Sequence, residues 1–441
     1  MRPIPLPPFV EERLPSGLTL RAARWGKRPS VAAALLFPGA GSVSDPEGLE
    51  GLAEVVADTF LDGTHSRSSR ELAEAIDDLA LSCDISAGYD SAVAHMAILE
   101  RDLDAGLSLF AEVLAQPAFR EEEVDRNRRR HVDSLREQRS EPDFLGRERL
   151  LAELYPGHPY GRLAATEKGL TSLTAADVQR FFSSRFTFTN ATLVLVGPGD
   201  EGTLLSAAAR AFRTAAPGAT PAWAPPSPPA PRSGLSFHLI DRKESVQTNL
   251  LFARPALRRA DPLFVAAVVA NQSLGGGASS RLFRVLREER GLTYGTYSSV
   301  APRLTAGHFG ASIDCRTDAT REALAGLLDL IRAFAAEGPT EEEHARSSRY
   351  LTGSFAISHE TPGALVQDEL TRILHGLPED AWQTWRERVD RVTREEARDV
   401  AARFFSPEVG VVTAVGQAAV IRPVLESFGE TTVWDADGPR V

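Results

Sequence analysis

"LTAADVQRFFSSRFTFTNATLVLVG" (residues 173–197) recurs later in the chain as "VTREEARDVAARFFSPEVGVVTAVG" (residues 392–416). Each copy is typical of a helix with one apolar face, followed by a β-branched strand that closes on glycine. A helix–strand unit that returns at a long interval indicates internal duplication. We therefore compared the two halves of the chain.

Three further pairs of segments match in the same order. They are a β-rich strand, a helix followed by alternating strands, and amphipathic helices followed by Pro and an acidic helix start. The pairs are residues 30–37 with 245–252, 68–98 with 279–309, and 101–126 with 317–346. Each half thus runs strand, helix, helix, strands, long helices, strand. This order predicts an α+β fold in which helices pack on a mainly antiparallel sheet.

A segment dense in Pro and Ala, "TAAPGATPAWAPPSPPAPRSG" (residues 214–234), lies near the midpoint of the 441-residue chain. It has no apolar period, and such composition is typical of an extended, semi-rigid linker. We expect an N-terminal domain over residues 1–213, a linker over 214–234 and a C-terminal domain over 235–441.

Composition excludes several classes of function. The net charge of −11 argues against general nucleic-acid binding, and the basic run Arg126–Arg130 is interleaved with acids like a solvated helix face. No run approaches the roughly 18 apolar residues of a membrane helix, and the first residues lack the apolar core of a secretory signal. The only two cysteines, Cys83 and Cys315, are expected to be buried thiols in a reducing cytoplasm.

The stretch "GLAEVVADTFLDGT" (residues 51–64) has the layout of a zinc-binding helix that runs into a Gly-Thr turn, yet it contains no histidine. The nine histidines of the chain are at least 15 residues apart, so no His-x-x-Glu-His or His-Glu-x-x-His motif exists elsewhere. The sequence also lacks a Gly-x-Ser-x-Gly motif. No other hydrolytic site can be assembled from these residues.

At this point the chain resembles the pitrilysin/insulinase-type metallopeptidases, particularly the bacterial relatives of mitochondrial processing peptidase. The segments that carry the resemblance are "LPSGLTLRAAR" (14–24), "FPGAGSVSDPEGLEGLAE" (37–54), "HPYGRLAATEKGLTSLTAADVQRFF" (158–182) and "LGGGASSRLFRVLREERGLTYGTYSS" (274–299). They cover nearly the whole chain in order. The resemblance implies two homologous pitrilysin-type domains.

In active members of this family the opening motif is His-x-x-Glu-His. Two His side chains one helical turn apart bind one zinc ion, the Glu is the general base, and a Glu from a later helix completes the ligand set. Anchoring the stretch on Gly51 and on Gly63–Thr64 fixes which residues stand at these positions. They are Glu54 and Asp58 in place of the two His, Ala57 in place of the base, and Ser134 near the place of the later ligand.

None of the four roles is filled by the residue of the family. We therefore expect no metal ion or other cofactor in this chain. Glu54 and Asp58 share a helix face and leave two interpretations open: a weak site for a hard cation, or a solvated or hydrogen-bonded acidic pair. Without imidazole or thiolate the pair would be a poor zinc site, and Ala57 could not act as a base.

In the second half, Arg287 and Tyr294 match the family's second-domain Arg and Tyr, seven residues apart. The resemblance implies that this pair contacts the substrate backbone and stabilises the developing oxyanion. A guanidinium and a phenol are both donors suited to a carbonyl oxygen that gains charge. The alternative is an exposed helix residue and a strand residue that packs on the sheet.

The glycines Gly275, Gly276 and Gly277 form a loop before a helix without the Lys of a phosphate-binding loop. They give either a flexible backbone edge near a bound peptide or a tight connection. His158, in "GHPYGR", is interpreted as a structural or capping residue.

The sequence thus predicts a non-catalytic, substrate-binding subunit of a heterodimeric zinc endopeptidase. Its expected partners are a catalytic chain that carries His-x-x-Glu-His and its zinc, and a peptide substrate. Two rivals remain: a scaffold or peptide-binding protein without a role in hydrolysis, and a self-sufficient metallopeptidase that uses Glu54, Asp58 and an unidentified ligand.

Overall fold

The computed structural model describes residues 6–214 and 223–436. Most of the N-terminal part of the expected linker therefore lies outside the described residues, and residues 223–233 form neither helix nor strand. The chain divides into two compact units. Unit 1 comprises Met1–Leu135, Ala164–Pro225 and Phe355–Gln383, and unit 2 comprises Arg136–Leu163, Pro226–Ser354 and Thr384–Val441, as far as these ranges are described.

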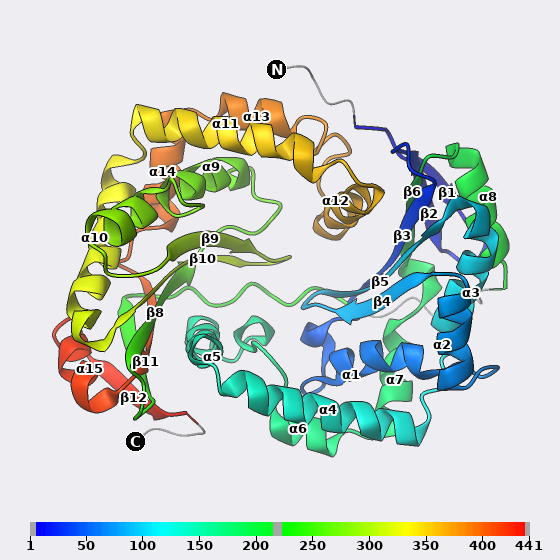
Figure 1. Ribbon diagram of the computed structural model, residues 1–441, viewed down its shortest axis with the longest axis horizontal. Coiled ribbons are helices and arrows are strands. Elements are labelled where there is room, and N and C mark those ends of the chain that lie inside the picture. The colour runs from blue at the N-terminus through cyan, green and yellow to red at the C-terminus, as the bar shows by residue number, and fades with distance from the viewer. Residues whose placement is uncertain (1–5, 215–222, 437–441) are drawn as a thin grey trace. The chain divides into compact units, whose positions relative to one another are not determined.

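Unit 1 is built on one mixed sheet (Figure 1). Its strands are β1 (Val10–Arg13), β2 (Thr19–Arg24), β3 (Ser30–Pro38), β4 (Ser82–Ala87), β5 (Ser91–Leu99) and β6 (Thr192–Gly197). Its helices are α1 (Leu52–Thr59), α2 (Ser69–Asp78), α3 (Leu103–Ala115), most of α4 (Glu121–Arg139), α6 (Glu167–Ser172), α7 (Ala175–Arg185), α8 (Glu201–Ala211) and α12 (Pro362–His375).

Unit 2 repeats this plan. Its strands are β7 (Leu235–Asp241), β8 (Gln247–Pro255), β9 (Thr296–Pro302), β10 (Gly307–Arg316), β11 (Gly410–Gly416) and β12 (Thr431–Asp435). Its helices are α5 (Pro142–Leu154), α9 (Phe264–Leu274), the π-helix η6 (Phe283–Glu289), α10 (Thr320–Glu337), most of α11 (Glu341–Ser358), α13 (Trp385–Arg391), α14 (Arg394–Phe404) and α15 (Ala418–Glu426).

The two sheets confirm the duplication predicted from the sequence. The order β2-β6-β3-β5-β4 in unit 1 corresponds to β7-β11-β8-β10-β9 in unit 2, with one parallel pair followed by antiparallel pairs in each. The outer strands differ, because β1 is antiparallel to β2 whereas β12 is parallel to β7. The fold is therefore α+β with mixed, mainly antiparallel sheets of six strands each within the described residues.

The matching helices α7 and α14 begin with the same local signal. Thr174 and Asp177 form a capping box at α7, and Thr393 and Glu396 form one at α14. In each box the Thr hydroxyl accepts a bond from the backbone N–H three residues later, and the acidic side chain accepts from the Thr backbone N–H. The sequence thus sets the start of both helices locally.

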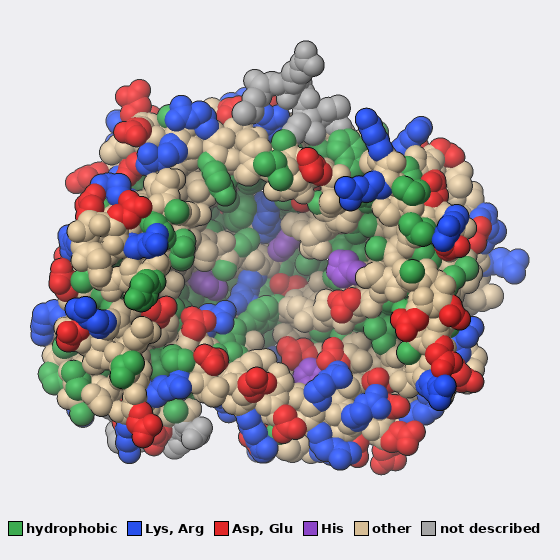
Figure 2. Space-filling model, in the orientation of Figure 1, with side chains coloured by type: hydrophobic (Ala, Val, Ile, Leu, Met, Phe, Trp, Pro, Cys, Tyr) green, Lys and Arg blue, Asp and Glu red, His purple; other side chains and the backbone are tan. Residues whose placement is uncertain are grey.

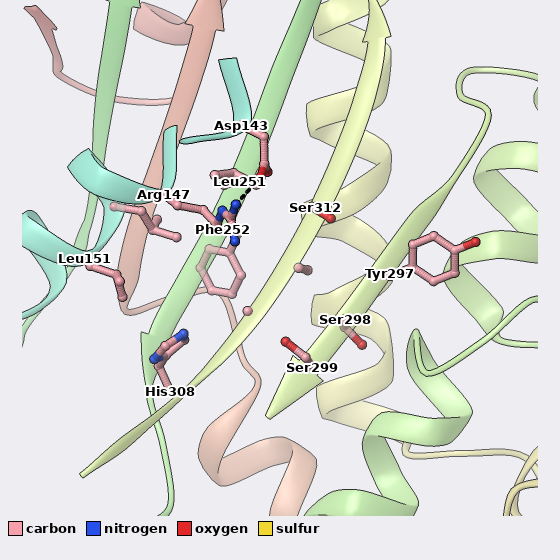
Figure 3. A pocket seen from close by; sticks show the side chains of 13 residues that line it. Asp143, Arg147, Leu151, Leu251, Phe252, Tyr297, Ser298, Ser299, His308 and Ser312 are labelled. Carbon is pink, nitrogen blue, oxygen red and sulfur yellow. Dashed lines mark ion pairs between the residues drawn. The ribbon is translucent and has the colours of Figure 1, made fainter. Parts of the chain in front are cut away.

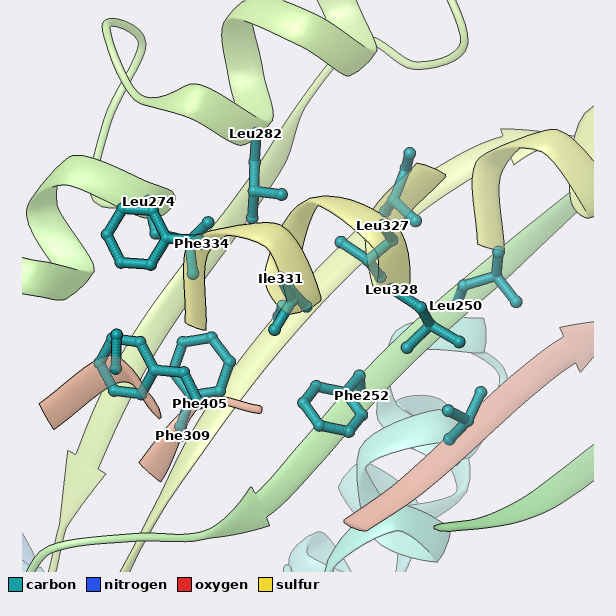
Figure 4. Close-up of a cluster of buried hydrophobic side chains, with 14 of the residues drawn as sticks. Leu250, Phe252, Leu274, Leu282, Phe309, Leu327, Leu328, Ile331, Phe334 and Phe405 are labelled. Atoms are coloured by element: carbon teal, nitrogen blue, oxygen red, sulfur yellow. The ribbon is translucent and has the colours of Figure 1, made fainter. Parts of the chain in front are cut away.

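The core of unit 2 lies between one face of its sheet and α9, α10 and α14 (Figure 4). Phe252 of β8 and Phe309 of β10 point toward Ile331 and Phe334 of α10. The ring of Phe309 stacks on Phe405 with 4.2 Å between centroids. Buried and less buried residues alternate along β10, whereas β8 is buried on both faces over Thr248–Ala253, because α5 covers its other side.

Each unit also receives a helix from the other half of the sequence. Helix α12 packs on β3 and β6 of unit 1 through Leu365, Val366 and Leu370, and α5 packs on β8 and β11 of unit 2. A buried ion-pair network joins Glu369 of α12 to Arg21 of β2 and to Arg372. The compact units therefore do not coincide with continuous halves of the chain.

Charge is mixed on the surface shown in Figure 2, where acidic and basic side chains alternate. The basic run Arg126–Arg130 lies on α4, where Arg126 pairs with Asp62 and Arg128 pairs with Asp125. Within residues 6–214 and 223–436, no helix has both the length and the apolar character that a membrane crossing requires. Cys315 is buried, but Cys83 is only partly buried on the edge strand β4.

Candidate functional site

The stretch that the sequence analysis aligned with the family's metal motif lies on α1, whose start is fixed by a carboxylate. Asp45 accepts hydrogen bonds from the backbone N–H groups of Gly51 (2.8 Å) and Ala53 (2.9 Å). These two donors are among the backbone groups that a helix start leaves unpaired. Asp45 thereby sets the position from which Glu54 and Asp58 project.

The four positions of the motif differ in burial. Glu54 is partly buried, Asp58 is exposed with 39% of its side-chain surface accessible, and Ala57 is buried. Ser134 lies partly buried on α4. A methyl group at the position of the general base cannot accept a proton from water.

Asp58 is held by two residues of α4, His131 and Arg130, that the sequence analysis did not assign to the site. His131 Nε2 lies 3.0 Å from Asp58 Oδ2, and Arg130 Nη2 lies 3.1 Å from the same oxygen. His131 precedes Ser134 by three residues on one helix, so both point to the same side. That spacing is the signal in the sequence that could have revealed His131.

The two carboxylates of the pair titrate in opposite directions. Burial raises the pKa of Glu54 above its ordinary value, the charge of Asp58 adds to this, and His131 opposes it. Burial would also raise the pKa of Asp58, but the hydrogen bond and charge of His131, together with Arg130, lower it below the ordinary value. The cluster therefore stabilises charge on Asp58 and disfavours it on Glu54.

These residues do not fit a zinc ion. The motif on α1 offers only carboxylates, and the imidazole of His131 beside it already shares a hydrogen bond with Asp58, so the set lacks the free imidazole and thiolate donors that zinc prefers. Asp58 already shares its oxygen with a guanidinium, whose positive charge would repel a cation bound there. Among the described residues, no group of three or more His, Cys, Asp or Glu side chains could hold a metal ion.

Arg287 lies on the π-helix η6, which the sequence did not predict. Arg290 N–H donates to the carbonyl of Val285, five residues earlier, as a π-helix requires. The guanidinium of the exposed Arg287 lies 4.5 Å from the centre of the Phe283 ring. Single π-helical turns occur often at functional sites, because they shift the side chains that follow.

Tyr294 lies on the loop that follows η6, between Gly291 and Gly295. Its side chain is 91% exposed, so it does not pack on the sheet as the alternative interpretation required. Tyr294 lines an open hollow of about 420 Å³ with Arg290, Asp314 and Arg316. Arg287 is not among the described residues that line this hollow.

The glycine loop is closely packed at its first residue. Gly275 is buried, its carbonyl accepts a bond from Ser298 N–H of β9, and a Cβ at this position would lie 2.3 Å from Ser298 Oγ. Gly276 and Gly277 are partly buried, and a Cβ on Gly277 would meet only Gln272 Nε2, at 3.5 Å. Gly275 therefore serves close contact between α9 and β9.

His158 is a capping residue, as interpreted from the sequence. Its Nδ1 accepts a hydrogen bond from Tyr160 N–H at 3.1 Å, and its Nε2 lies 2.8 Å from the carbonyl oxygen of Ser227. Both ring nitrogens thus make hydrogen bonds to backbone groups within unit 2.

Two family models match this chain, one after the other along the sequence. Residues 26–167 match the family model described as insulinase (peptidase family M16), and residues 172–351 match the model described as peptidase M16 inactive domain. Together the two models span most of the chain.

An uncharacterized zinc protease of Streptomyces coelicolor is 26% identical over 92% of this chain and 87% of its own length. The non-peptidase homolog YmxG of Helicobacter pylori is 23% identical over 83% of this chain and 84% of its own. The crystal structure of a peptidase M16 inactive domain from Pseudomonas fluorescens superimposes with a TM-score of 0.86 at 25% identity, over 93% of this chain and 98% of that one. The chain belongs to the insulinase family of metallopeptidases, peptidase family M16.

Proposed function

We propose that this chain is the non-catalytic, peptide-binding subunit of a heterodimeric zinc endopeptidase. A partner chain with His-x-x-Glu-His supplies the zinc ion and the general base. This chain supplies Arg287 and Tyr294 as hydrogen-bond donors to the peptide and to the oxyanion that forms on it.

The observation that carries the proposal is the set of contacts that Asp58 makes with α4. Arg130 forms an ion pair with Asp58, and the His131 ring shares a hydrogen bond with the same oxygen, so side chains of α4 already engage the carboxylate that the sequence alignment assigns to a metal-ligand position. Together with Ala57, this arrangement removes both the Lewis acid and the base from the chain. It argues against a self-sufficient metallopeptidase that uses Glu54 and Asp58.

Exposure supports a role for the second-half pair toward an external ligand. Arg287 is exposed and Tyr294 is almost fully exposed, so their donors are open to a peptide carbonyl. One relative is named an uncharacterized zinc protease and another a non-peptidase homolog, so the names of similar chains include both peptidases and non-peptidases.

The rival function is that of a scaffold or peptide-binding protein without a part in hydrolysis. One observation favours it: Arg287 rests on Phe283, and Tyr294 lines a hollow that does not include Arg287. The two functions differ in what happens to turnover when the arginine is removed.

The test is steady-state cleavage of an internally quenched peptide by this chain, by a family member that carries His-x-x-Glu-His, and by their mixture. We expect the isolated chain to be inactive and the mixture to be active. Arg287→Ala should lower kcat of the mixture while size-exclusion chromatography shows unchanged assembly. Arg284→Ala is the matched control, because Arg284 lies on the same helix and pairs with Glu289. Unchanged kcat and KM in Arg287→Ala would establish the scaffold.

A further inference from the structure

A pocket in unit 2 lies over the part of the sheet that α5 leaves open (Figure 3). Helix α5 packs mainly on β11 and β8, whereas β10 and β9 continue beyond it. The pocket has a volume of about 310 Å³ and is bounded by α5, β8, β10 and β9. It is separate from Arg287 and Tyr294, which are not among the described residues that line it.

The sequence of β10 explains why this space is open. Phe309 and Ile313 are buried in the core on one face of the sheet. Gly310 and Ser312 alternate with them and line the pocket from the other face. Ser299 of β9, which pairs with Gly310, also lines the pocket. Small side chains on adjacent strands leave room that none of the described helices fills.

The walls of the pocket combine apolar side chains with hydroxyl groups and the Asp143–Arg147 ion pair. Leu150 and Leu151 of α5 and Leu251 of β8 form the apolar side, and Ser299 and Ser312 bring hydroxyl groups. A pocket with apolar walls and a few placed polar groups is the usual form of a ligand site. At about 310 Å³, it is at the small end of such sites and suits one large side chain rather than a nucleotide.

Charge inside the pocket is compensated. Burial lowers the pKa of His308 to about 4, with Arg303 adding to the effect, so this ring is neutral at pH 7. Its Nδ1 lies 3.4 Å from the hydroxyl of Tyr155. Arg147 and Asp143 form an ion pair of 2.8 Å across one turn of α5, and both are about half exposed. A charged ligand would have to break this pair or lie unpaired against leucines, which is unfavourable.

We propose that this pocket binds one uncharged aromatic side chain of a peptide. The leucines contact the ring, while Ser299, Ser312 and His308 offer hydrogen bonds to the backbone amides beside it. This inference rests on the proposed peptide-binding function and adds to it a preference for an aromatic residue, set by unit 2 away from Arg287 and Tyr294.

The test uses the full-length chain and two capped tripeptides, acetyl-Ala-Phe-Ala-amide and acetyl-Ala-Lys-Ala-amide, with binding measured by NMR titration. We expect the Phe peptide to bind at least tenfold more tightly than the Lys peptide. Gly310→Val should weaken binding of the Phe peptide at least tenfold. A Cβ at Gly310 would meet its nearest atoms at 3.6 and 3.8 Å, so the added side chain fits the strand and occupies the pocket.

Ala97→Val is the matched control, because Ala97 is exposed on β5 of unit 1 and the change also enlarges a strand residue. It should leave binding of the Phe peptide unchanged. Equal affinity for the two peptides, no binding of the Phe peptide at millimolar concentration, or unchanged binding by Gly310→Val would each overturn the pocket proposal. Loss of this proposal would leave the subunit function standing if Arg287→Ala still lowers kcat of the mixed complex.

Discussion

His131 of α4 lies 3.0 Å from the carboxylate of Asp58 on α1. The sequence alignment predicts that Asp58 takes the position of a zinc-binding histidine of the family, and in this structure its carboxylate is engaged by a side chain of a neighbouring helix instead. Arg130 forms an ion pair with the same oxygen. The first three predictions below follow from this contact between α1 and α4.

Asp58→Asn should destabilise the protein at pH 7, by less than about 1 kcal/mol because the pair is partly exposed. The pKa of Asp58 is lowered in the folded state, so its contribution is present above its unfolded pKa of about 3.9 and is lost as pH falls through the lower folded value. Urea denaturation at pH 7 and pH 3 measures this. A difference between Asp58→Asn and wild type that grows at pH 3 would contradict it.

At pH 7, Glu54→Gln should change the folding stability in the opposite direction to Asp58→Asn. The pKa of Glu54 is raised in the folded state, mainly by burial, so the folded protein binds this proton more tightly than the unfolded chain. Its charged form therefore opposes folding at pH 7, and this effect disappears below the unfolded pKa. The same denaturation series should show Glu54→Gln to be as stable as wild type, or more stable, at pH 7.

Restoring the motif on α1 alone should not create a tight zinc site. Glu54→His, Ala57→Glu and Asp58→His together still lack the ligand from α4 and leave Arg130 beside the new donors. Adding Ser134→Glu and Arg130→Ala should allow zinc to bind. Elemental analysis of the purified proteins measures the zinc content. One zinc per chain in the triple variant would show that the remaining metal ligand is not at position 134.

Tyr294→Phe should lower kcat of the mixed complex with little change in KM, if the phenol acts on the transition state. Removal of one oxyanion donor typically costs on the order of 10²-fold in rate, about 3 kcal/mol. A tyrosine that only holds the ground-state peptide would instead raise KM at constant kcat. Tyr350→Phe is the control, because Tyr350 is another exposed tyrosine, on α11.

Gly275→Ala should destabilise the protein by about 1–3 kcal/mol, because its methyl group would overlap Ser298 of β9. Gly277→Ala should be close to neutral, since its Cβ meets only the end of a flexible side chain. Thermal unfolding of the two variants compares them directly. Equal stability would favour the flexible-loop interpretation of these glycines.

The sequence by itself determined the duplicated α+β plan. Repeated period-2 and helical patterns, and the capping boxes at Thr174 and Thr393, act within a few residues and can be recognised along the chain. The absence of the zinc-binding histidines was also visible there, because helix geometry fixes which positions share a face.

Only the tertiary structure decided which groups meet. An amphipathic pattern shows that α12 has an apolar face, but not that this face packs on β3 and β6 of unit 1. The contacts of Asp58 with His131 and Arg130 join residues more than 70 positions apart. The open pocket beside α5 depends on how far one helix extends across a sheet. Such contacts arise from packing between elements distant in sequence, which local periodicity does not encode.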